Sequence, residues 1–120
     1  MFDFEKLEVY QVTKIQNFEV LKFLIETPNF NSEIASQWKD ASMGSVLNLA
    51  ESTARMSHAD KRHYLTIARG NINVCVALIE LAKEMEWLDT EKHQAFYSRY
   101  EQMSKMMLGM IRSFSNESKL

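Results

Sequence analysis

Apolar residues recur every three or four positions along four long segments of this chain, a spacing typical of amphipathic α-helices. Alternation of the kind expected in a β-strand is not sustained anywhere, and the 120 residues include only one Pro and three Gly. This scarcity of breaking residues favours long helices. Short connections between long helices favour antiparallel neighbours. The pattern therefore predicts an all-α protein: a single domain, residues 1–120, folded as an antiparallel up-down-up-down four-helix bundle.

Turn and capping residues set the limits of these helices. Pro28 ends the first helix because it cannot continue the backbone hydrogen-bond ladder. Ser32 is expected to cap the second helix, Ser57 the third, and the Leu88-Asp89 turn to open the fourth. The predicted ranges are 3–26, 32–54, 57–85 and 89–115, with residues 116–120 expected to fray.

The first and third helices each carry two apolar stripes. On the first helix, one stripe holds Phe4, Leu7, Ile15, Phe18, Leu21 and Ile25, and the nearly opposite one holds Val9, Val12, Val20 and Phe23. On the third, one stripe holds Leu65, Ala68, Ile72, Cys75 and Ile79, and the other holds Ile67, Val74, Leu78, Leu81 and Met85.

A monomeric bundle buries one broad stripe per helix, so a second stripe faces solvent or a further subunit. We therefore predict a homo-oligomer, and the candidate interface residues are Val9, Val12, Val20, Phe23, Ile67, Val74, Leu78 and Leu81. The alternative is an unusually wide core-facing surface, with the remaining apolar residues scattered over the exterior.

The second helix is built mainly from small residues, including Gly44 in its middle. A mid-helix Gly costs about 1 kcal/mol relative to Ala. Close approach of a neighbouring helix is the expected compensation.

Composition restricts the function. The formal net charge of -2 gives no global basic field to attract nucleic acid. The single Cys75 is expected to be a buried, reduced thiol. No signal peptide is recognisable, and no apolar run approaches the ~20 residues of a membrane span. We expect a cytoplasmic protein that does not enter a membrane.

Patterns for metal or enzyme chemistry are missing from the sequence. A di-iron bundle needs Glu-x-x-His pairs, and none of His58, His63 and His93 has a Glu three residues before it. The four Met residues between 103 and 110 continue an aromatic helical face, which indicates core packing rather than a copper site. Motifs for nucleophilic catalysis or phosphate binding do not occur. We predict no enzyme, no metal and no cofactor.

Polar residues near the second turn form the one candidate site. Asn48, Glu51 and Arg55 share a face of the second helix, and Arg69 of the third helix is expected within reach of Asp40. One interpretation is a structural hydrogen-bond network that fixes helix register or a subunit contact. The other is a local basic patch that contacts nucleic-acid phosphates, formed by Arg55, Lys61, Arg62 and Arg69.

Several short segments together resemble a known family. They are Phe4-x-x-Leu7-x-Val9-x-Gln11, Gln37 through Ala41, Asn48-x-Ala50-Glu51, Arg55, Leu65-x-Ile67-Ala68-Arg69-Gly70, Leu88-Asp89 and Leu108-x-x-Ile111-Arg112. With these, the chain resembles the four-helix bundle proteins encoded by intervening sequences in bacterial 23S rRNA genes, sometimes labelled a ribosomal protein family. The accessory variability determinant of diversity-generating retroelements belongs to the same group.

The resemblance implies an antiparallel bundle, often a pentameric ring, without known catalytic activity. It also implies a nucleic-acid role, because retroelement members are basic and bind RNA or DNA together with a reverse transcriptase. This chain has Lys39-Asp40 where a basic pair is usual, and Ser52 where Gly is usual. The leading hypothesis is a non-enzymatic homo-oligomeric scaffold or accessory protein, and the alternative is a weak RNA- or DNA-binding protein.

Overall fold

Four long helices make up the protein, as the sequence predicts. The computed structural model describes residues 1–117, with side chains described through Ser115, and no strand occurs in this part of the chain. The elements are a short 3₁₀ helix η1 (Asp3–Lys6), α1 (Glu8–Glu26), α2 (Ser32–Ala54), α3 (His58–Glu84) and α4 (Thr90–Glu117).

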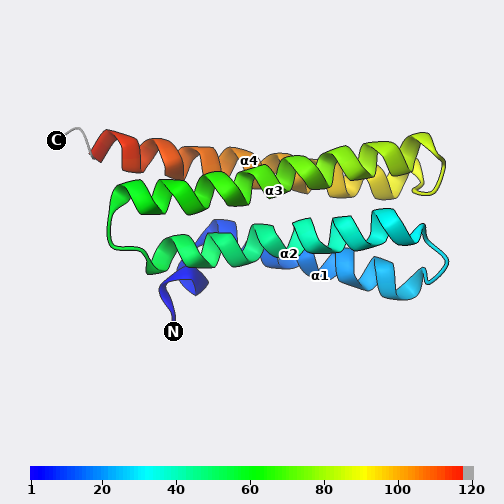
Figure 1. Cartoon of the computed structure of the whole chain (residues 1–120), viewed down its shortest axis with the longest axis horizontal. Coiled ribbons are helices and arrows are strands. Elements are labelled where there is room, and N and C mark those ends of the chain that lie inside the picture. The colour runs from blue at the N-terminus through cyan, green and yellow to red at the C-terminus, as the bar shows by residue number, and fades with distance from the viewer. Residues whose placement is uncertain (118–120) are drawn as a thin grey trace.

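The helices form an antiparallel rod about 51 Å long, with α2 and α3 in front and α1 and α4 behind them (Figure 1). Each helix packs against the ones before and after it, and α1 also packs against α4. Because α1 lies against α2 and α4 but not against α3, α1 and α3 occupy diagonal corners of the bundle. The predicted up-down-up-down architecture is confirmed.

Side-chain caps begin three of the helices. The Ser57 hydroxyl accepts a hydrogen bond from the Asp60 amide at 3.0 Å, and the Asp89 carboxylate accepts one from the Lys92 amide at 2.7 Å. The cap predicted for α2 is wrong by one residue. Asn31, not Ser32, is the N-cap, because its Oδ1 accepts from the Ile34 amide at 3.0 Å.

The first predicted helix is interrupted near its start. Leu7 has extended backbone angles, φ -79° and ψ 132°, and separates η1 from α1. The Glu5 carboxylate accepts from the Phe2 amide at 3.0 Å and holds η1 as a separate turn. At the other end, α4 continues through Asn116 and Glu117, which were expected to fray, while residues 118–120 lie outside the described part.

The α3–α4 turn contains one backbone position that strains its side chain. Glu86 has φ 62°, in the left-handed region, as the chain leaves α3. The Trp87 amide donates to the Ala82 carbonyl at 2.9 Å, a bond that caps the free carbonyls of the helix end. This position usually holds glycine, because a Cβ costs about 1–2 kcal/mol there.

We expect Glu86→Gly to raise the free energy of unfolding by about 0.5–1 kcal/mol, since relief of this strain exceeds the entropy that glycine gains in the unfolded chain. Urea unfolding at one fixed protein concentration measures the change. Glu84→Gly, in the last turn of α3, is the matched control and should lower the stability, because there the backbone is helical. A destabilised Glu86→Gly variant would contradict this account of the turn.

The core runs the length of the rod and includes the largest buried side chains of each long helix. Trp38, Leu65, Ile72 and Tyr100 are fully or almost fully enclosed. The predicted core stripe of the third helix is confirmed: Leu65, Ala68, Ile72, Cys75 and Ile79 are all buried. Met103 and Met107 are buried and Met106 and Met110 pack against the core, as predicted.

The predicted interface stripe of the first helix is wrong. Val9 and Val20 are buried within the chain itself, and Val12 and Phe23 pack against the same core. The neighbouring helices satisfy Gln16 and Asn17 of this face, which allows it to be buried. Gln16 bonds to the Phe96 carbonyl of α4 at 2.8 Å, and Asn17 accepts from Ser42 of α2 at 3.1 Å.

The opposite stripe of α1 is the exposed one. Ile15, Phe18 and Ile25 are 50%, 62% and 78% exposed. On α3, Leu78 is buried and is not an interface residue, since it adjoins Ile79 at the edge of the core face. Ile67, Val74 and Leu81 are 39%, 46% and 55% exposed, so these three predicted residues are open to a partner.

Close packing of α2 and α3 explains Gly44. A Cβ built at this position would lie 2.7 Å from Nδ2 of Asn71 on α3, closer than atoms in real structures approach. The helices lie close together here, as the small residues of α2 predict, and a side chain at position 44 would displace the Asn71 amide.

One helix in the described part, α3, is long and apolar enough to cross a membrane by length and composition alone. Its apolar face contributes to the bundle core, and a core helix passes the same test. Packing within the bundle buries 39% of this apolar window.

Candidate functional site

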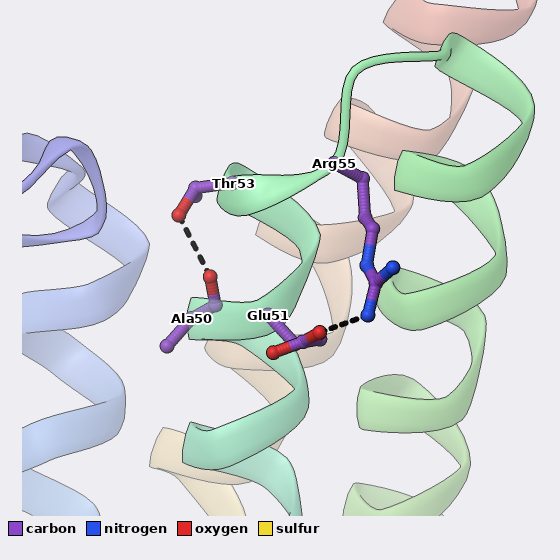
Figure 2. A network of polar contacts seen from close by, with 4 residues as sticks. All are labelled: Ala50, Glu51, Thr53 and Arg55. Carbon is purple, nitrogen blue, oxygen red and sulfur yellow. Dashed lines mark hydrogen bonds and ion pairs between the residues drawn. The ribbon is translucent and has the colours of Figure 1, made fainter.

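The polar residues at the end of α2 form a local network, shown in Figure 2. Arg55 is the C-cap of α2, and its guanidinium turns back to pair with the Glu51 carboxylate one turn earlier. The same guanidinium lies 4.5 Å from the ring centre of Tyr64 on α3. The bond to Glu51 raises the pKa of Arg55. Arg55 thus joins α2 to α3 through an ion pair and a cation–π contact.

Asn48 does not join this network. Its Nδ2 donates to the Gly44 carbonyl at 2.9 Å, within α2. Thr53 likewise bonds to the Ala50 carbonyl of its own helix at 2.7 Å (Figure 2). The i to i+4 pairing of Glu51 with Arg55 is confirmed, but Asn48 bonds within its own helix and does not contact this pair.

Arg69 is placed differently from the prediction. Instead of Asp40 on α2, its Nε donates to the Ser104 carbonyl and hydroxyl of α4, at 3.2 and 3.0 Å. The expected contact is wrong because each helical residue turns by 100°. Asn71 faces α2 beside Gly44, so Arg69, two residues earlier, is rotated to the flank that faces α4.

The other two cations of the predicted basic patch bind helix ends. Lys61 Nζ donates to the Ser52 and Thr53 carbonyls at 3.5 and 3.4 Å, at the C-terminus of α2. Arg62 Nη1 donates to the Phe114 carbonyl of α4 at 3.3 Å. Free carbonyls and the helix dipole make a C-terminus attractive to cations. All four candidate phosphate-binding residues therefore have partners within the chain.

A buried polar network that the sequence analysis missed crosses the middle of the bundle. The Trp38 indole donates to the Tyr100 hydroxyl at 2.9 Å, and that hydroxyl also contacts Cys75 and Ser42. Burial raises the pKa of Tyr100 well above its ordinary value and that of Cys75 to about 11. Cys75 is thus a protonated, unreactive thiol at neutral pH, as the sequence predicts.

A second cross-link joins α1 to α4 through Gln16. Its Nε2 donates to the Phe96 carbonyl, while its Oε1 accepts from Arg99 Nη1 at 2.9 Å. Thr13, Gln16 and Asn17 share a helical face with Val9 and Val20. Polar residues on a helix face are typical of solvent exposure, so the sequence alone does not signal this cross-link.

The histidines do not assemble a metal site. No group of three metal-binding side chains occurs among the described residues. His63 is exposed, and His58 lies beside the Phe114 ring, 5.3 Å between centroids. His93 is buried, 2.6 Å from a Glu80 carboxylate oxygen, and stacks on Tyr97. The His93 contact ties α4 to α3 and was not predicted.

Comparisons with known proteins agree with this architecture. Residues 5–109 match the profile of the 23S rRNA-intervening sequence protein family. A solved structure of a protein of unknown function from the S23 ribosomal protein family of Bacteroides thetaiotaomicron VPI-5482 has a TM-score of 0.80 to this chain. The two are 19% identical, and the similarity covers 86% of this chain and 97% of the other. No curated protein matches the chain.

Proposed function

Because this chain belongs to the 23S rRNA-intervening sequence protein family, we propose that it is a non-enzymatic scaffold or accessory protein of the cytoplasm that works as a homo-oligomer. Five copies in a ring is the number that the family resemblance implies. The assembly is the part of this proposal for which the molecule itself gives physical support.

The exposed stripe of α3 carries the proposal. Ile67, Val74 and Leu81 are spaced by seven residues and therefore lie on one line along the helix. Each is between 39% and 55% exposed. Gly70, which has no side chain, lies beside this line between Ile67 and Val74 and is also exposed. A heptad line of this kind suits close packing against a helix of another copy.

A second exposed stripe, on α1, gives that line a suitable partner. Ile15, Phe18 and Ile25 project from the helix diagonal to α3. The exposed Lys14 and Lys22 stand four residues before and after Phe18, whereas the exposed Asp60 and Glu84 stand at the two ends of the α3 line. The α1 stripe also has the exposed Glu26 beside Ile25, so it carries charges of both signs, and the two stripes are alike in being apolar surfaces with charged margins.

When two different faces of one subunit bind each other, the contact is head-to-tail. Repetition of such a contact closes into a ring when the rotation per subunit allows it. By contrast, α4 has no exposed large apolar side chain among its described residues. We place α1 of one copy against α3 of the next, with α4 outside the interface.

Light scattering coupled to size exclusion tests the assembly. A pentamer of 14.0 kDa chains has a mass of five times that value, about 70 kDa. A single species of that mass at micromolar concentration supports the ring. The mass of another whole number of chains supports the oligomer but corrects the number of subunits. A 14 kDa monomer overturns the proposal.

The contacts that the basic residues make within the chain support a scaffold rather than the alternative, a weak RNA- or DNA-binding protein. We expect no retarded complex with a structured RNA at low salt, because Arg55, Lys61 and Arg62 already bind groups of the chain. A gel-shift titration measures this. Binding that weakens with added salt and falls in Arg55→Ala/Arg62→Ala, but not in the control Lys39→Ala/Lys83→Ala, would restore nucleic-acid binding as the function.

A further inference from the structure

A groove of about 480 Å³ lies between α3 and α4, on the flank of α3 that faces α4. Ile72, Val76 and Tyr97 give it an apolar lining. Arg69, Ser104 and Lys105 lie together at one end, because Arg69 bonds to Ser104 across the two helices. Volumes of this size are typical of small-molecule sites.

Short side chains leave this space open. Ala77 of α3 and Ser104 of α4 line the groove where longer residues would fill it. Tyr100 and Ile72 beneath them are almost fully buried and belong to the core, so the floor is rigid. The concave shape is therefore set by the packing of the bundle and does not depend on a mobile loop.

Arg69 is positioned for an anion. Both of its hydrogen bonds use Nε, at 3.0 Å to Ser104 Oγ and 3.2 Å to the Ser104 carbonyl, so neither uses the terminal Nη nitrogens. These two nitrogens can bind the two oxygens of one carboxylate. Lys105 adds a second cation, and Glu101 is the one acidic residue in the lining, which leaves the groove with a net positive charge.

We propose that this groove is a binding site for a small amphipathic carboxylate. The carboxylate pairs with Arg69 and Lys105, and an aromatic or aliphatic body lies over Ile72, Val76 and Tyr97. The apolar part supplies contact area, while the anchored guanidinium selects the anion. This assignment also gives Arg69 a role beyond its bond to α4.

The groove is separate from the proposed subunit interface. The groove lies on the flank of α3 that packs against α4. Ile67, Val74 and Leu81 lie on another side of α3, nearer to Asn71 and α2. Binding is therefore expected in the oligomer and in monomeric variants alike, and failure of one proposal does not bring down the other.

Two probes with the same ring system test the site: 2-naphthoate, an anion, and 2-naphthamide, its neutral counterpart. Isothermal titration calorimetry with the full chain should show one naphthoate per chain, bound at least about ten-fold more tightly than the amide. Backbone NMR shifts should map naphthoate to residues 69–77 of α3 and 97–105 of α4.

Variants test separately the contribution of the Arg69 charge and that of the open space in the groove. Arg69→Gln should reduce naphthoate affinity to that of the amide, whereas Lys83→Gln, an exposed cation of the same helix outside the groove, should leave it unchanged. Ala77→Trp fills the space and should abolish binding of both probes. If Arg69→Gln does not fold, Lys105→Gln takes its place. Equal affinity for both probes, binding that survives Ala77→Trp, or no binding at all overturns the proposal.

Discussion

The double variant Val74→Glu/Leu81→Glu is expected to be a monomer of 14 kDa under conditions in which the unmodified chain is an oligomer. Both residues are about half exposed in the single chain, so glutamate is tolerated there by the fold. Within a helix-to-helix contact the same carboxylates would lose water against the apolar side chains of the facing stripe, which costs several kcal/mol per charge. Light scattering measures the mass directly.

The matched control makes the same change in charge on α4, which lies outside the proposed interface. Gln94→Glu/Gln102→Glu adds two carboxylates at exposed positions of α4 and should leave the mass unchanged. Circular dichroism of both variants should show the helix content of the parent chain. An oligomer that survives the α3 substitutions would show that this stripe is not the contact.

A second variant tests whether the contact is head-to-tail. Phe18→Glu/Ile25→Glu disrupts the α1 stripe and should also be monomeric. A mixture of the α1 and α3 variants retains one intact stripe from each, so it should form a heterodimer of twice 14.0 kDa, about 28 kDa. If each stripe paired with its own copy instead, each variant alone would dimerise through its intact stripe, and no new species would appear on mixing.

Trp38→Ala is expected to lower the free energy of unfolding by about 3–5 kcal/mol, the usual cost of removing a large buried aromatic ring. Trp38 is fully buried, its ring centre lies 5.1 Å from that of Phe96, and its indole bonds to Tyr100. Trp38→Phe keeps most of the ring but leaves the Tyr100 hydroxyl without its donor, so about 1–2 kcal/mol should be lost. Urea unfolding at fixed protein concentration measures both.

The second tryptophan of the chain is the control. Trp87 is 41% exposed in the α3–α4 turn, so Trp87→Ala should cost far less than Trp38→Ala. Comparable losses at the two positions would mean that the core is not organised around Trp38 and its polar network.

The candidate site was predictable only where the contact is local. Glu51 and Arg55 pair because they are four residues apart on one helix, a distance that periodicity fixes. The Ser57 and Asp89 caps followed from the same short-range geometry. The partner of Arg69 could not be predicted in this way. Whether Arg69 contacts α2 or α4 depends on how α3 is rotated about its axis within the bundle.

Helix number, helix limits to within a few residues, and the antiparallel order were readable from spacing and from turn residues, because these depend on neighbours along the chain. Which stripe of α1 enters the core was not readable. Val9 and Ile15 are equally apolar, and the hydrophobic effect has no direction. That choice came from packing: Phe96 of α4 and Ser42 of α2 supply partners for Gln16 and Asn17, which removes the cost of burying an unpaired amide on this face. The same tertiary arrangement leaves Phe18 and Val74 at the surface, and with them the apolar faces on which the proposed assembly depends.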